Sequence, residues 1–178
     1  MCHYKKGNQD DIIFVFSCPG KYEEKSKEPA SGQTGKNLNM LLEILDKELI
    51  GVASFKRNDI NITNSTTNVE FKARTNRTEA TINEVLEEKN LNRLYNEIKN
   101  IKKLIICAGK NANLAVDKIL EKKSDIIADK VCIEHIGMQS INSKIKKDIK
   151  GTEIRRGEIG NTKKRLEVIA LDIKKQIV

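Results

Sequence analysis

Four polar side chains stand where apolar runs of this sequence end, and their types could do chemistry together. Ser17 and Cys18 follow the first run, Asn64 follows the second, and His135 follows the last. A histidine can exchange a proton near neutral pH, and an amide can pair with the polar edge of a ligand. Cys18 could also act as a nucleophile with His135 as its base, although no third, orienting group is evident. A hydrogen-bonded structural role for the histidine stays open as well.

The polar loop after the first run comes close to a phosphate-binding loop. Residues 30–37 read Ala-Ser-Gly-Gln-Thr-Gly-Lys-Asn. Ala30 stands where that motif needs glycine, and Asn37 stands where a serine or threonine would hold magnesium, so nucleotide hydrolysis is not expected. We expect a helix to open at Lys36, with its first amides able to contact a phosphate or a sugar.

The cysteines do not indicate a metal site. Cys2, Cys18, Cys107 and Cys132 form no C-x-x-C pair, which favours free thiols in a reducing compartment. Cys132 and His135 could in principle share a metal with Cys2 and His3, but the spacing matches no zinc pattern. We therefore expect no metal and no cofactor.

The elements that would position these residues alternate along the chain. Short apolar runs predict strands over residues 12–16, 60–63, 104–107 and 131–134. Apolar residues at helical spacing predict helices around residues 38–49, 82–86, 91–98, 112–120 and 166–177. This alternation predicts an α/β fold, a three-layer α/β/α arrangement with a mainly parallel four-stranded central sheet. Ligands of such sheets bind beyond the carboxyl ends of the strands.

The charge is unevenly distributed. The net charge is +8, and residues 144–178 hold 11 basic and 5 acidic side chains, which is +6 of that total. We expect one domain over residues 1–178, with a basic segment and a C-terminal helix at residues 143–178. Such a segment can neutralise nucleic-acid phosphates or form an ordinary solvated surface. No stretch is long and apolar enough for a membrane span, and no signal peptide is evident, so we expect a cytoplasmic protein.

Five segments, in order, resemble motifs of the uracil-DNA glycosylase superfamily, and they are most similar to its family-four branch. The first is the loop that holds Pro19-Gly20, Glu23-Glu24, Pro29, Gly32 and Gly35 before a leucine-rich helix. The others are Ile62-Thr63-Asn64, Asn76-Arg77 with Glu84, the stretch from Leu104 to Ala112, and His135 where the family's His-Pro-Ser motif begins. The resemblance covers about residues 11–142.

The resemblance implies an enzyme that flips a nucleotide out of DNA and cleaves its glycosidic bond. It implies that His135 donates to the departing base and that Asn64 bonds the base edge. Ser17 and Gln33 complete the expected catalytic set, with Gln33 as the best substitute for orienting water. The base pocket is expected to contain Cys18, Pro19, Gly20, Ala30 and Ser65. DNA contacts are expected from Lys36, from Lys144 and from a loop of Gly137, Met138, Gln139 and Ser140, in which Met138 could fill the vacated stack.

The departures from the family pattern concern the acid and the stacking ring. Ser17 and Cys18 occupy the place of a carboxylate or an asparagine that orients water, and Ala30 replaces a stacking phenylalanine. Asn68 stands at one position of the family-four iron–sulfur cysteines, so no cluster is expected. His-Pro-Ser has become His135-Ile136-Gly137, which loses the phosphate-binding serine unless Ser140 compensates.

We therefore expect a monofunctional DNA glycosylase that acts as a monomer on DNA, since no lysine stands where Schiff-base chemistry would need it. The opening at Ala30 favours a bulky modified pyrimidine, such as the glucosylated hydroxymethylcytosine of phage DNA, and a role in antiviral defence. The alternatives are a uracil-DNA glycosylase of base-excision repair and a catalytically weak DNA-binding module of the same fold.

Overall fold

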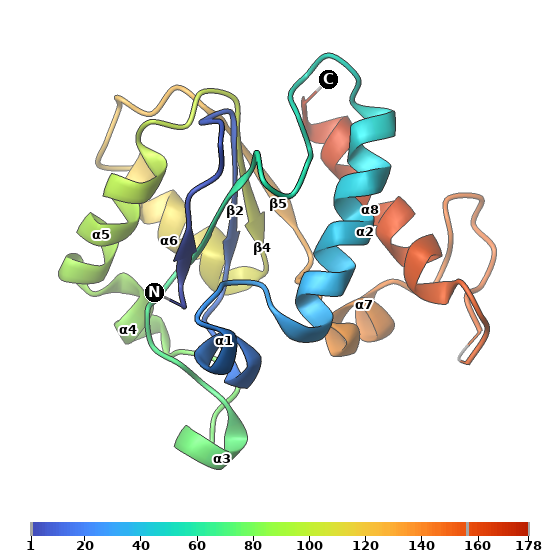
Figure 1. Cartoon of the computed structure of the whole chain (residues 1–178), viewed down its shortest axis with the longest axis horizontal. Coiled ribbons are helices and arrows are strands. Elements are labelled where there is room, and N and C mark those ends of the chain that lie inside the picture. Colours follow the sequence, from blue (N-terminus) through green and yellow to red (C-terminus); the bar gives the residue numbers. More distant parts are fainter. Residues whose placement is uncertain (1, 156, 178) are drawn as a thin grey trace.

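The computed structural model describes residues 2–155 and 157–177 as strands and helices that alternate along the chain (Figure 1). The strands are β1 (Tyr4–Lys5), β2 (Ile12–Phe16), β3 (Asn61–Asn64), β4 (Leu104–Ala108) and β5 (Asp129–Ile133). The helices are α1 (Lys21–Ser26), α2 (Gly32–Glu48), α3 (Lys72–Thr75), α4 (Ile82–Leu86), α5 (Glu88–Ile98), α6 (Lys110–Leu120), α7 (Met138–Lys144) and α8 (Asn161–Ile177).

The strands form one sheet in the order β1-β3-β2-β4-β5. The four predicted strands are parallel to one another, and Phe14 at the centre of β2 pairs with Ile62 on one side and Ile106 on the other. β1 is an addition to the predicted four strands, and it runs antiparallel to β3 with Tyr4 opposite Thr63. It was missed because two residues, Tyr and Lys, carry no apolar run.

Helices cover both faces of the sheet, so the predicted three-layer arrangement is confirmed. Every residue of β2 is buried, and its side chains alternate between the two faces. Phe14 and Phe16 pack into the cluster that includes α2 and α8. Ile13 and Val15 pack on the opposite side into the cluster of α4, α5 and α6. Figure 1 shows these two helical layers on either side of the strands.

The predicted helices form, but the first of them begins earlier than expected. α2 starts at Gly32, with Ser31 as its N-cap, and not at Lys36. Gly32 and Gly35 are poor helix formers, which is why the apolar pattern indicated a later start. Lys36 is exposed within α2, so the prediction that the helix-opening amides lie at this residue was wrong.

Three short helices had no signal in the apolar pattern. α1 and α3 contain no buried residue, and in α7 only Ile141 is buried. Two of them matter for the site, because α1 follows β2 directly and α7 begins three residues after His135. The segment Gly137–Ser140 is therefore a helix start and not the loop that the sequence predicted.

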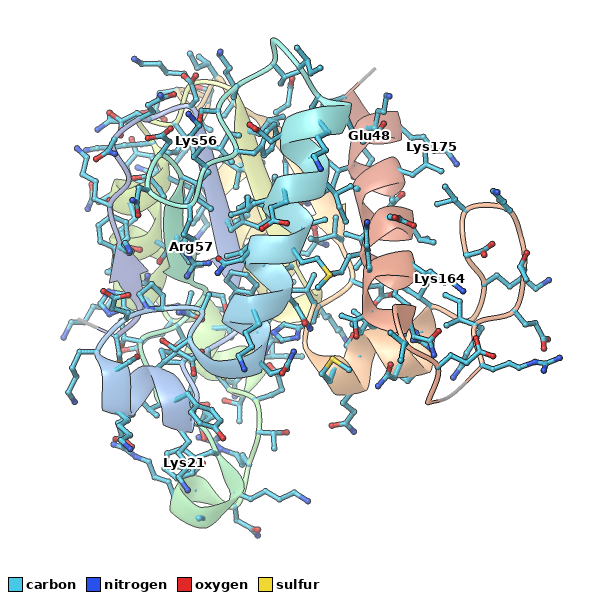
Figure 2. All side chains as sticks on the ribbon, turned by 45° about the vertical axis from the view of Figure 1, so that its right-hand side comes forward. Lys21, Glu48, Lys56, Arg57, Lys164 and Lys175 are labelled. Carbon is cyan, nitrogen blue, oxygen red and sulfur yellow. The ribbon has the colours of Figure 1, made fainter. Side chains whose placement is uncertain are left out.

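Two basic residues of the C-terminal segment are engaged within the chain. Arg165 is buried and donates through Nε to the carbonyl oxygen of Ile145 at 3.0 Å, and Lys174 pairs with Glu48 at 3.1 Å. Figure 2 shows Lys175 at the end of α8 that is remote from Lys21 of α1. Among the described residues, no helix combines the length and the apolar character needed to cross a membrane.

Candidate active site

A pocket of about 170 Å³ lies at the carboxyl edge of the sheet. Six residues that the sequence predicted line it: Ser17, Cys18, Gly20, Ala30, Asn64 and His135. Six further residues complete it: Phe16, Glu23, Thr34, Glu70, Thr78 and Glu79. A larger groove of about 440 Å³ lies between α2 and α8, lined by Met40 and Leu171 among others. The smaller pocket is the candidate site because the predicted strand-end residues meet there.

His135 is held as a neutral hydrogen-bond donor. The backbone N–H of Gly137 donates to His135 Nδ1 at 3.0 Å, so Nδ1 is an acceptor and the proton belongs on Nε2. Burial lowers the pKa of His135, and the charges of Glu79 and Glu23 oppose this shift only in part. The edge-on ring of Phe16, 6.0 Å away between centroids, fixes the orientation of the imidazole.

Two glycines allow the backbone to approach this histidine. A Cβ on Gly137 would lie 2.9 Å from His135 Nδ1, where it would displace the ring or its hydrogen bond. Gly109, at the end of β4, has a φ of +96° and would place a Cβ 3.2 Å from the Cβ of His135. Gly137 therefore fits this position because it has no Cβ to press on the imidazole while its N–H sets the tautomer.

Asn64 is fixed from both sides at the end of β3. Its side chain is buried, and Nδ2 donates to the carbonyl oxygen of His3 at 3.2 Å. Arg93 donates through Nη2 to the carbonyl oxygen of Asn64 at 3.0 Å. A primary amide has two N–H hydrogens and an acceptor oxygen, so the bond to His3 leaves one hydrogen and the oxygen for a ligand in the pocket.

Glu79 supplies a carboxylate that the sequence did not reveal. It lies between α3 and α4, and its Oε2 accepts a hydrogen bond from Ser17 Oγ. Asn111, in the first turn of α6, donates through Nδ2 to Ser17 Oγ at 3.3 Å and lies 3.4 Å from Glu79 Oε2. The strand end thus lacks an acid of its own but binds one from a neighbouring segment. The only sequence signal was an acid shortly after the Asn76-Arg77 motif.

Cys18 is a protonated thiol. Burial, followed by the charge of Glu79, raises its pKa to about 12, and its Sγ donates to the carbonyl oxygen of Thr78 at 3.8 Å. A thiolate is the nucleophilic form of cysteine, and this environment suppresses it. Cys18 is therefore a wall of the pocket, in keeping with its predicted place there, and a poor nucleophile.

Glu23 and Glu70 are engaged in holding the rim. Glu23 accepts the N–H of Gly20 at 3.1 Å and that of Ser31 at 2.8 Å, which joins the two ends of the loop. Glu70 is buried and accepts from Arg77 at 2.6 Å. These two carboxylates are thus occupied by structural bonds.

The Asn-Arg and Glu motifs of the sequence form a clamp beside the pocket. Arg77 bridges Glu70 and Glu84, and it lies 3.0 Å from a carboxylate oxygen of Glu84. Its guanidinium lowers the pKa of Glu84 to about 2. The clamp fixes both ends of the short segment that carries Glu79.

Three predicted residues lie outside the pocket. Gln33 is exposed, and its Nε2 donates to Asn37 Oδ1 at 3.0 Å, so its expected role in orienting water has no support in the geometry. Ser65 is buried and donates to the carbonyl oxygen of Ser17 at 2.6 Å. Pro19 accepts the N–H of Glu70 through its carbonyl oxygen at 2.9 Å. Ser65 and Pro19 thus each bond to a residue that lines the pocket, Ser17 and Glu70 respectively.

The residues predicted to contact DNA fall into two groups. Lys36, Gln139 and Lys144 are exposed and available to a ligand. Met138 is half-buried and packs against the core cluster of α2 and α8, with its sulfur 3.6 Å from Asn37 Nδ2. Its proposed insertion into a base stack stays a prediction and would require this side chain to leave its packed position. Ser140 and Gly137 are partly exposed.

No metal site accompanies this pocket in the part of the chain that the structure describes, where no three His, Cys, Asp or Glu side chains gather to hold an ion. Cys132, considered above as a partner of His135 in metal binding, is directed instead toward Asn113, with Sγ 2.6 Å from Oδ1.

The fold and the pocket agree with a comparison against known families. No curated protein matches the chain. The profile of the uracil DNA glycosylase superfamily matches residues 4–171. This range covers nearly the whole chain and includes every residue that lines the pocket. The chain therefore belongs to the uracil-DNA glycosylase superfamily.

Proposed function

We propose that this protein is a monofunctional DNA glycosylase that hydrolyses the N-glycosidic bond of a flipped base, and that the base is a bulky modified pyrimidine. The observation that carries the proposal is one pocket that is lined by the neutral donor His135, by Asn64 and by the carboxylate of Glu79. Departure of a pyrimidine base leaves negative charge that is delocalised onto its exocyclic carbonyl oxygen, and an N–H donor aimed at that charge lowers the barrier.

Ala30 supports a modified base over plain uracil. Its side chain is a single methyl group on the pocket wall, and its φ of +49° lies in a region that bulky side chains rarely adopt. The backbone is held there by Arg57, which donates to the carbonyl oxygens of Pro29 at 3.3 Å and of Ala30 at 3.1 Å. Figure 2 shows Arg57 beside α2. Glucosylated hydroxymethylcytosine in phage DNA is the substrate that we favour, with antiviral defence as the role.

Hydrolysis by water is favoured over Schiff-base chemistry. Among the described residues that line the pocket, none is a lysine, so no amine is placed to form a covalent bond with the sugar. The Cys18 thiol is protonated and gives no alternative nucleophile. An abasic site with an intact backbone is the expected product.

An abasic-site assay tests the proposal. The purified chain is incubated with four duplexes that differ only in one base: cytosine, uracil, hypoxanthine and glucosylated hydroxymethylcytosine. Products are detected by alkaline cleavage, and the released base is identified by mass spectrometry. We expect release of the glucosylated base at a rate well above that of the others.

The other outcomes separate the alternatives. Release of uracil alone would assign the chain to base-excision repair and refute the modified-base proposal. DNA binding without release of any base would assign it to the catalytically weak binding modules. The latter is disfavoured by Glu79, because a carboxylate is present in the pocket although the strand end lacks one.

A further inference from the structure

Water is a weak nucleophile, and its attack on a glycosidic carbon requires a group that orients it and accepts its proton. Enzymes that hydrolyse glycosidic bonds use carboxylates for this task, and the same charge stabilises the positive character that develops on the sugar. Three carboxylates line this pocket: Glu23, Glu70 and Glu79. The carboxylate that activates water must have an oxygen that is not already engaged in hydrogen bonds.

The hydrogen bonds distinguish the three carboxylates. Both oxygens of Glu23 accept backbone N–H groups. Both oxygens of Glu70 accept bonds from Arg77, and Thr75 donates to it as well. For Glu79, the hydrogen bonds from the described residues all go to Oε2. Its other oxygen, Oε1, is left for a water molecule.

We propose that Glu79 is the carboxylate that orients and deprotonates the attacking water, and that Ser17 and Asn111 are positioning residues that hold it. This inference rests on the proposed glycosylase function. It assigns the acid of this pocket to the segment between α3 and α4, and it turns the strand-end Ser17 from a candidate catalytic residue into a donor that fixes the catalytic one.

The reaction step balances without any further reactant. The water oxygen forms a bond to C1′ of the sugar while the bond from C1′ to the base nitrogen breaks. The electron pair of that bond leaves with the base, where the Nε2–H of His135 stabilises the charge. One water proton passes to Glu79 and then to solvent, and the released base takes a proton from solvent.

The segment that carries Glu79 is held in place by contacts on both sides of this residue. Arg77, two residues earlier, is held between Glu70 and Glu84. Ala80, the next residue, is buried, and its carbonyl oxygen accepts from Asn111 Nδ2 at 3.1 Å. Preorganised groups contribute more to catalysis than mobile ones, because they need no reorganisation when charge develops.

Glu79→Gln tests the inference, with Glu121→Gln as the matched control. Both glutamates are exposed, and Glu121 lies at the far end of α6 from Asn111, so neither change should unfold the chain, which thermal unfolding would verify. The single-turnover rate of base release is measured on the substrate that the wild type cleaves. We expect Glu79→Gln to lower it about 10²–10⁴-fold and Glu121→Gln to leave it unchanged. Affinity for DNA with a non-hydrolysable 2′-fluoro analogue of that nucleotide should stay the same.

Ser17→Ala adds a readout that a merely structural role would not change. Ser17→Ala removes the donor to Glu79 Oε2 and should lower kcat while KM stays unchanged, whereas Ser17→Thr, which keeps the hydroxyl, should restore kcat. A Glu79→Gln rate within threefold of wild type would overturn the inference and leave the glycosylase proposal intact. A wild type that releases no base from any duplex would overturn both.

Discussion

Because His135 is neutral, two substitutions at this position can separate its role as a hydrogen-bond donor in catalysis from its contribution to packing. His135→Gln replaces the imidazole by an amide whose oxygen can accept from Gly137 N–H and whose N–H₂ can still donate into the pocket. His135→Ala removes both interactions. The two variants thus differ in hydrogen bonding at the site, while both abolish titration at this position.

The expected magnitudes follow from these contacts. Loss of a donor to a developing oxyanion typically costs about 10²–10³-fold in rate, or about 2.7–4 kcal/mol. The rate of base release by His135→Ala should therefore be lower than that of the wild type by at least this factor. It also removes the edge-on contact with Phe16, worth about 0.5–1.5 kcal/mol of stability. His135→Gln should retain part of the rate, because a donor remains, and should lose the same aromatic contact.

The pH dependence of stability provides the second measurement. The pKa of folded His135 is lowered by burial, so the unfolded state takes up the proton first as the pH falls. The contribution of the neutral imidazole is complete above the unfolded pKa of about 6.5 and is lost as the pH falls through the folded pKa. In urea denaturation, the unfolding free energy of the wild type should therefore decrease more steeply from pH 7 to pH 5 than the unfolding free energy of His135→Gln.

Two results would refute this account of His135. Equal pH dependence of the two proteins would mean that the imidazole is not held neutral by the fold. A His135→Ala enzyme with the full rate of base release would mean that the donor to the base is another residue.

Three further predictions concern the pocket wall and the DNA contacts. Ala30→Phe should strain the backbone at its positive φ and slow release of a bulky base more than that of uracil, whereas Ala30→Gly should preserve both rates; equal slowing for both bases would refute the idea of space at this wall. Cys18, whose pKa is raised to about 12, should resist iodoacetamide at pH 8 in peptide mapping by mass spectrometry, and Cys18→Ser should keep its activity; rapid alkylation would contradict the protonated thiol. Lys144→Ala should weaken DNA binding and reduce the slope of log affinity against log salt by about 1, while Lys175→Ala at the far end of α8 should change neither; the reverse ranking would move the DNA interface toward the C-terminus.

The sequence predicted the architecture because its signals are local. Four short runs rich in apolar residues indicate strands, of which β2 is buried along its whole length, and the leucines of α2 recur at helical spacing. From a parallel sheet it follows that strand-end residues meet, and Ser17, Asn64 and His135 do line one pocket. That step required only the direction of the strands and no knowledge of side-chain contacts.

The acid could not be predicted in the same way, because its position depends on contacts between distant segments. Glu79 lies on an irregular stretch after α3, a four-residue helix without a buried side chain. Its partner Ser17 is 62 residues away in sequence. The clamp of Glu70, Arg77 and Glu84 that fixes this stretch is equally invisible to periodicity. Gln33 was preferred for its place in the first loop, yet its side chain turns back to Asn37 of its own helix.

The two unusual residues at the end of β2 have a common explanation in this arrangement. Ser17 donates to the carboxylate of Glu79. Cys18 donates to the carbonyl oxygen of Thr78, the residue before Glu79. A carboxylate at either position would meet the charge of Glu79 at short range, and like charges in a shared site repel. In the proposed mechanism the strand end therefore needs small, neutral donors because the acid comes from the neighbouring segment between α3 and α4. An acid restored to position 17 should then interfere with Glu79 and lower the rate, rather than rescue a site that lacks one.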